Sequence, residues 1–187
     1  KMKFIDEIIS FFQDQFNAKE HIHLHEPVFR GNERKYLLDT IDSTMVSSSG
    51  YYVNKFEEMM TSITSTKKGI ALVNGTSGLQ VALKLVGVKE GDEVVTQALT
   101  FVATANAIAS NGASPIFIDV DLDTMGLSPN ALECFLIQFV ELRDTGSYNK
   151  LTGKRISACL PMHTFGFPVH MDDLKLICDA WKIPIVE

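Results

Sequence analysis

Residues 93–120 read EVVTQALTFVATANAIASNGASPIFIDV, and this stretch decides the fold class of the chain. The short run Glu93–Thr96 predicts a buried strand, the small residues of Ala103–Ser110 predict a closely packed helix, and Ile116–Val120 predicts a second strand. Strand, helix and strand in this order form a unit whose two strands pair in parallel. We therefore expect an α/β layer.

The same alternation continues on both sides of this stretch. Three more strands are expected at Ile70–Val73, Ile156–Leu160 and Ile183–Val186, with helices at Leu79–Val86, Ala131–Val140 and Leu174–Trp181. Ser128 and Pro129 have the pattern of a helix cap followed by a first turn, whereas Arg143–Lys154 is polar and predicts a loop. Five strands with helices between them predict a mainly parallel sheet.

The first part of the chain has a different pattern, so we place an N-terminal helical arm with loops at 1–68 and the α/β domain at 69–187. Apolar residues at helical spacing predict amphipathic helices over Phe4–Phe16 and Val53–Ile63. Asn32 is placed to cap a short helix between these two.

Alternate histidines at positions 21, 23 and 25 suggest an extended arm between the first two helices. A zinc ion needs a fourth ligand and supporting hydrogen bonds, which this segment does not offer, so we expect no metal site.

Composition excludes several classes of function. The chain has 187 residues, 45% of them hydrophobic, and 17 Lys and Arg against 23 Asp and Glu, for a net charge of −6. No overall positive field attracts nucleic acid or anionic membrane, and no apolar run approaches the ~18 residues that span a bilayer. Three cysteines without a Cys-x-x-Cys spacing indicate reduced, buried thiols, so we expect a cytoplasmic protein without nucleic-acid or membrane partners.

A glycine-rich turn follows the first expected strand of the α/β domain. Asn74-Gly75-Thr76-Ser77-Gly78 opens a helix, so free backbone amides, hydroxyls and the positive helix end converge there and could hold a phosphate. The turn lacks the Gly-Lys-Ser/Thr of a P-loop and the third glycine of a dinucleotide fingerprint. The alternative is a simple helix start capped by Thr76.

Other candidates follow later strands. Phe101 comes after the strand at 93–96 and could stack on a planar cofactor, although a phenylalanine there is more often part of the core. His163 follows the strand at 156–160 and could be a general acid, a substrate contact or a loop residue held by hydrogen bonds. Asp119 and Asp121 resemble a carboxylate pair, but Asp123 and Thr124 favour a turn.

These motifs occur in the order seen in one family of enzymes. The motifs are Val73–Leu79, Gly91–Val94, Gln97–Ile108, Asp119–Asp121 and Pro161–His163 through Ile185–Glu187. Together they resemble the nucleotide-sugar aminotransferases of the DegT/DnrJ/EryC1/StrS family over nearly the whole chain. Pro27–Glu33 and Ser47–Gly50 look most like the branch that aminates a 4-keto sugar nucleotide on the way to legionaminic-type nonulosonic acids.

The resemblance implies the type I fold of pyridoxal phosphate (PLP) enzymes, a three-layer α/β/α large domain, and a homodimer that moves an amino group from glutamate to a keto sugar. In this chain Gly75, Thr76 and Ser77 would hold the PLP phosphate and Phe101 would stack on the pyridine ring. His163, Asn32 and Ser49 would lie on the side of the nucleotide-sugar substrate.

Two groups central to the family's chemistry have no matching position in these 187 residues. In the family an aspartate that pairs with the pyridine nitrogen follows Ile-Val-Glu, and the Schiff-base lysine comes later. We therefore expect an amino-terminal fragment without a catalytic residue of its own, which binds PLP weakly or not at all and is inactive alone. Two alternatives stay open, a sugar dehydratase of the same fold that uses pyridoxamine phosphate (PMP), and a non-catalytic module that binds a phosphate or nucleotide.

Overall fold

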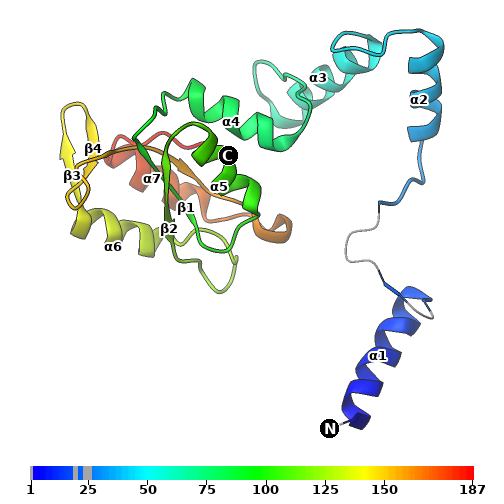
Figure 1. The fold of residues 1–187 in the computed structure, drawn as a ribbon, viewed down its shortest axis with the longest axis horizontal. Coiled ribbons are helices and arrows are strands. Elements are labelled where there is room, and N and C mark those ends of the chain that lie inside the picture. Colours follow the sequence, from blue (N-terminus) through cyan, green and yellow to red (C-terminus); the bar gives the residue numbers. More distant parts are fainter. Residues whose placement is uncertain (1, 19–20, 23–26) are drawn as a thin grey trace. The chain divides into compact units, whose positions relative to one another are not determined.

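The computed structural model describes residues 2–18, 21, 22 and 27–187, drawn in Figure 1. The chain divides into two compact units, one that extends to Ala71 and one from Leu72 to Glu187. No helix in the described ranges is both long and apolar enough to cross a membrane.

The first unit is helical, as predicted. Its helices are α1 (Met2–Phe16), α2 (Glu33–Asp42) and α3 (Tyr51–Thr64). Asn32 precedes α2, but its side chain makes no capping hydrogen bond, so this part of the prediction is wrong. Instead the Glu33 carboxylate turns back and accepts a hydrogen bond of 2.9 Å from the Gly31 amide. Two of the three arm histidines, His23 and His25, lie outside the described residues.

The second unit contains the sheet. Its elements are α4 (Gly75–Leu85), β1 (Glu93–Gln97), α5 (Val102–Ser110), β2 (Ser114–Ile118), α6 (Pro129–Phe139), β3 (Val140–Arg143), β4 (Gly146–Asn149), β5 (Arg155–Leu160), the short 3-10 helix η1 (Thr164–Gly166) and α7 (Met171–Ala180). Ser128 caps α6 as predicted, since its hydroxyl accepts a hydrogen bond of 3.3 Å from the Ala131 amide.

The sheet has the order β2-β1-β5-β4-β3. β1 pairs in parallel with both β2 and β5, and all five β1 residues are buried, which is typical of a central strand covered on both faces. Neighbouring residues of β1 point to opposite faces. Val94 packs with α4 and α5, whereas Val95 packs with α6 and α7. The α/β class and the three layers are therefore confirmed.

Two expected strands differ from the structure. Residues 70–73 form no strand: the Ala71 amide donates to Glu57 Oε1 at 2.8 Å, and the preceding Gly69 amide donates to Thr61 Oγ1 at 2.7 Å. Residues 183–186 lie beside β5 but form a single parallel bridge, Cys159 with Ile185.

The expected loop at 143–154 contains most of an antiparallel hairpin. β3 and β4 pair from Val140 with Asn149 to Arg143 with Gly146, and β4 continues the sheet onto β5. Three of the four β3 residues are exposed, so the hairpin lacks the apolar run that predicts a buried strand. The sheet is accordingly mixed, parallel on one side and antiparallel on the other.

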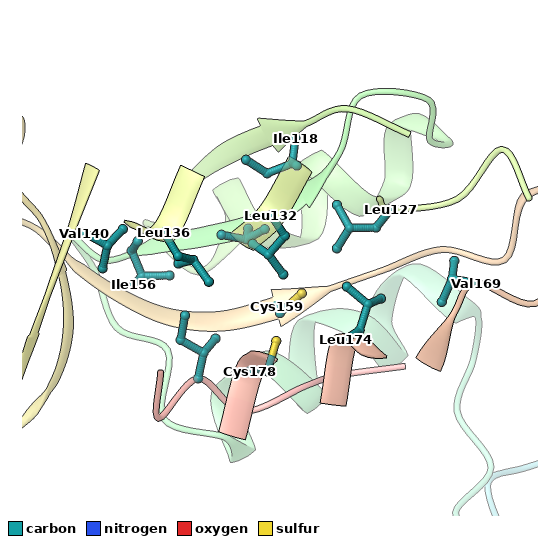
Figure 2. Packing of buried hydrophobic residues seen from close by; sticks show 12 residues of the cluster. Ile118, Leu127, Leu132, Leu136, Val140, Ile156, Cys159, Val169, Leu174 and Cys178 are labelled. Carbon is teal, nitrogen blue, oxygen red and sulfur yellow. The ribbon is translucent and has the colours of Figure 1, made fainter. Parts of the chain in front are cut away.

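The core between the sheet and α6 and α7 holds two of the three cysteines. Figure 2 shows Cys159 on β5 and Cys178 on α7 in one cluster with Leu132, Leu136 and Leu174. The hydrogen bond to Cys178, together with burial, raises the pKa of the Cys159 thiol. Both thiols are buried as predicted. Cys134 is exposed, contrary to prediction, because α6 turns Leu132 and Leu136 inward instead.

Candidate cofactor site

The start of α4 offers free hydrogen-bond donors. Asn74, not Thr76, caps the helix, since its side-chain oxygen accepts a hydrogen bond of 2.9 Å from the Ser77 amide. No residue in the described chain accepts a hydrogen bond from the amides of Gly75 and Thr76. A side-chain carbon added at Gly75 would meet nothing within 4 Å. The helix end, two free amides and open space together suit a phosphate group.

Phe101 lies at the start of α5 with its side chain 70% exposed. Phe101 is therefore not part of the core that the described residues form, although its position in the sequence favoured a core role. α4 and α5 cover the same face of the sheet, where Leu83, Ala107 and Ile108 share one cluster. An exposed phenylalanine ring at the start of a helix is free to stack on a planar ligand.

His163 follows β5, and both of its ring nitrogens have partners. Nδ1 accepts a hydrogen bond of 3.2 Å from the Val169 amide, and Nε2 lies 2.8 Å from Glu187 Oε1. Because Nδ1 is the acceptor, the neutral ring carries its proton on Nε2 and donates it to the carboxylate. His163 is thus fixed within its loop, with about a third of its side chain exposed.

Sequence reasoning did not identify Gln97, the last residue of β1. Its side chain is fully buried and contacts three loops at the carboxyl end of the sheet. Nearby, the Thr100 hydroxyl reaches Met162 Sδ at 3.3 Å. The available sign in the sequence was two consecutive polar residues, Thr96 and Gln97, that follow the apolar pair Val94 and Val95.

Asn32 and Ser49 belong to the first unit, and both are exposed. The Ser49 amide donates to Ser47 Oγ at 3.5 Å. The loop that contains both serines borders a hollow of about 570 Å³ between α2 and α3, lined among others by Ser47, Gly50 and Tyr52. The loop that we predicted on the substrate side therefore borders a hollow, and Asn32 and Ser49 are both accessible within the first unit.

Aromatic side chains beside this hollow were also missed. The ring centroids of Tyr36 and Tyr52 are 4.8 Å apart and those of Tyr51 and Tyr52 are 5.1 Å apart. Lys55 Nζ lies 5.6 Å from the centroid of Tyr51 and 5.8 Å from that of Tyr36. The spacing of Tyr51 and Lys55, four residues apart on one helix face, was the sign in the sequence.

The aspartates after β2 form a turn, as predicted. The Asp121 amide donates to the Gly126 carbonyl at 2.9 Å, and the Met125 amide donates to the Asp121 carbonyl at 2.8 Å. Asp121, Asp123 and His170 place one ligand atom each within 4.8 Å of one another and could surround a cation. A hydrogen bond of 3.0 Å between Asp123 and His170 already accounts for that arrangement, and it raises the pKa of His170 and lowers that of Asp123.

Comparison with known proteins decides the family. The model of the DegT/DnrJ/EryC1/StrS aminotransferase family matches residues 27–187. The chain belongs to this family. EpsN of Bacillus subtilis (strain 168) is 36% identical over 166 residues, which are 89% of this chain and 40% of EpsN. GDP-perosamine synthase of Escherichia coli O157:H7 is 31% identical over 168 residues, 90% of this chain and 42% of the synthase.

Solved structures agree with this assignment. The crystal structure of 3-amino-5-hydroxybenzoic acid synthase matches with a TM-score of 0.71 and 26% identity, over 89% of this chain and 40% of that one. The DegT/DnrJ/EryC1/StrS chain described here thus spans about two fifths of the length of the relatives it matches.

The residues present fit the phosphate and ring of a pyridoxal cofactor. The two free amides and the open space at Gly75 suit the phosphate, and the exposed Phe101 ring suits the pyridine. Among the described residues the site offers groups that can bind a phosphate and a ring.

Proposed function

We propose that this chain is the cofactor-binding part of a PLP-dependent aminotransferase that acts on a nucleotide sugar with a 4-keto group. The observation that carries the proposal is the start of α4, where the amides of Gly75 and Thr76 are free beside open space. Membership of an aminotransferase family indicates that the phosphate compound held at such a site would be PLP. The name of one relative, GDP-perosamine synthase, supports a sugar nucleotide as the substrate.

In this proposal each side chain has a defined task. The amides of Gly75 and Thr76 and the hydroxyls of Thr76 and Ser77 hold the phosphate, which the positive end of α4 also attracts. Phe101 stacks on the ring and fixes its plane. When bound, PLP supplies the electron sink for amino transfer.

The other parts of the proposal concern the whole enzyme. Glutamate as amino donor, a homodimer, a cytoplasmic location and a role in making legionaminic-type surface sugars follow from the family resemblance. The loops around Asn32 and Ser49, with the hollow of about 570 Å³ between α2 and α3, would serve the sugar-nucleotide side. His163 would orient substrate through its loop.

The test is a titration of the 187-residue chain with PMP and with inorganic phosphate, measured by calorimetry. PMP carries no aldehyde, so it does not react with surface lysines. Thr76→Val should weaken the binding of both ligands by about 1.5–3 kcal/mol, the usual range for a hydrogen bond to a charged group. Phe101→Ala should weaken only PMP binding, by about 0.5–1.5 kcal/mol.

Two matched variants serve as controls. Thr152→Val removes another exposed threonine, and Phe117→Ala removes a half-exposed phenylalanine on β2. Neither should change either affinity. Equal affinity for phosphate and PMP in the wild-type chain would favour the non-catalytic phosphate-binding module instead.

A turnover experiment tests whether this chain alone can transfer the amino group. None of its lysines lies in a motif that resembles that of the family's Schiff-base lysine, so we expect weak PLP binding at most and no amino transfer. The chain is incubated with PLP, glutamate and a UDP-4-keto sugar, and the amino sugar is measured by mass spectrometry. Product above that of a PLP-only control would contradict this assignment.

A further inference from the structure

Gln97 makes an unusual set of contacts for a residue at the end of a strand. Its side chain has 0% exposure. Nε2 donates to Leu99 O at 2.8 Å, Thr164 Oγ1 at 2.9 Å and, at a longer 3.4 Å, Met125 O, while Oε1 accepts from the amides of Met162 at 2.9 Å and Leu127 at 3.0 Å. Two amides face the oxygen and two carbonyls face the nitrogen, so the orientation of the side-chain amide is fixed.

These partners belong to three loops that meet at the carboxyl end of the sheet. One loop leads from Gln97 itself to Phe101, one is the turn that ends at Leu127, and one contains His163. The Thr164 hydroxyl also donates to Met125 O at 2.8 Å, which ties the second and third loops together. One buried side chain therefore sets the position of the Phe101 backbone relative to the His163 backbone.

A neutral amide is the side chain that this position requires. A carboxylate would keep the two bonds at Oε1 but would set a negative oxygen against the Leu99 carbonyl. An apolar side chain would leave buried amides and carbonyls without partners, which proteins avoid. Gln97 thus matches four backbone groups that no shorter or charged side chain could match.

The sheet offers a contrast at its other end. Asn149 is also buried, and its Nδ2 donates to Glu93 Oε2 at 2.9 Å while its Oδ1 accepts from the Leu151 amide at 2.9 Å. That amide joins the hairpin to the first residue of β1 and contacts no loop of the candidate site. Both ends of the sheet therefore have a buried side-chain amide that makes hydrogen bonds. Of these two residues, Gln97 alone links the loop of Phe101 with the loop of His163.

We propose that Gln97 is a positioning residue of the cofactor site, which acts by holding the Phe101 ring in register with the loop that contains His163. This inference rests on the proposed function, because Phe101 needs a fixed position only if its ring contacts the cofactor. The phosphate contacts at Gly75–Ser77 come from a different helix and do not depend on it.

The test compares PMP with inorganic phosphate on the 187-residue chain. Gln97→Met keeps the length of the side chain and removes all its hydrogen bonds, so PMP affinity should fall about two- to tenfold, the range expected for a misplaced stacking contact. Affinity for inorganic phosphate should stay the same. Asn149→Ser, the matched control, should leave both affinities unchanged.

A double-mutant cycle shows whether Gln97 acts through Phe101. In the Phe101→Ala background Gln97→Met should cause no further loss of PMP affinity. A loss that adds fully to that of Phe101→Ala, or an equal loss for phosphate and PMP, overturns the inference. Wild-type chain that does not prefer PMP over phosphate refutes the proposed function itself, so the two failures are distinguishable.

Thr164→Val is the milder variant in case Gln97→Met does not fold. It removes one hydrogen bond of Gln97 and the bond to Met125, and it conserves the volume of the side chain. PMP affinity should fall in the same direction and less than for Gln97→Met, again with phosphate affinity constant. Unchanged PMP affinity in a folded Thr164→Val chain counts against the inference.

Discussion

Tyr52 shows how its surroundings change the chemistry of one side chain. Burial among its neighbours, together with the hydrogen bond of 2.8 Å that its hydroxyl donates to Asp39, raises the pKa of Tyr52 to about 12. Both causes favour the protonated phenol. The contribution of this group to folding is therefore present at neutral pH and is lost as the pH rises from the unfolded value near 10 through the folded pKa.

A spectrophotometric titration of tyrosinate checks this shift. The chain has four tyrosines, and Tyr52→Phe should remove the ionisation that occurs at the highest pH. Asp39→Asn, which replaces the charged acceptor, should move that ionisation to lower pH. If the step near pH 12 persists in Tyr52→Phe, the shift belongs to another residue.

Gly126 is a position where only glycine fits. A side-chain carbon there would lie 2.1 Å from Val169 Cγ1, well inside contact distance. Gly126→Ala should therefore lower the free energy of unfolding by about 1–3 kcal/mol, as overpacking usually does. The double variant Gly126→Ala with Val169→Ala should recover part of this loss in urea denaturation, and no recovery would mean that the strain lies elsewhere.

At the scale of elements, the start of α4 separates helix stability from anion binding. Asn74→Asp keeps an oxygen that accepts from the Ser77 amide and adds a negative charge at the positive helix end, so thermal stability should be kept or rise slightly. The same charge repels phosphate, so phosphate and PMP affinity should both fall. Equal ligand affinity in this variant would place the anion away from the start of α4.

The elements also show what the sequence could predict. β1 is fully buried, β5 is nearly so and β2 is partly buried, and the pattern of apolar residues predicted all three strands. Residues 70–73 are an apolar run too, but the Ala71 amide donates to Glu57 and the Gly69 amide to Thr61, and only the folded chain reveals these hydrogen bonds. The residues of the candidate phosphate site could be proposed from the sequence because hydroxyls and glycine at a helix start are local, whereas the partners of Gln97 come from loops up to 67 residues away.

At the scale of the whole molecule, large apolar side chains remain exposed on both units. Leu85, Leu122 and Leu176 are 82%, 97% and 71% exposed on the second unit, and the apolar face of α1 includes Phe12 and Phe16. β2 is an edge strand among the described residues, and such edges pair readily with other chains. We therefore expect dimers or larger species and low thermal stability.

Light scattering during gel filtration at several protein concentrations measures this association. Phe12→Glu, which places a charge on the apolar face of α1, should reduce the apparent mass, and Asp14→Asn on the same helix serves as the control. A compact monomer that unfolds cooperatively at high concentration would show that these surfaces do not attract each other.

The central place of β5 has a consequence for the newly synthesised chain. Of the five strands β5 is made last, and yet it lies between β1 and β4. Until the ribosome has added Leu160, the nascent protein can form one parallel pair and one hairpin, each with an open edge. At ordinary translation rates the stretch from Gln97 to Leu160 takes roughly 3–12 seconds to make. During those seconds the parallel pair and the hairpin both expose the strand edges that β5 later covers.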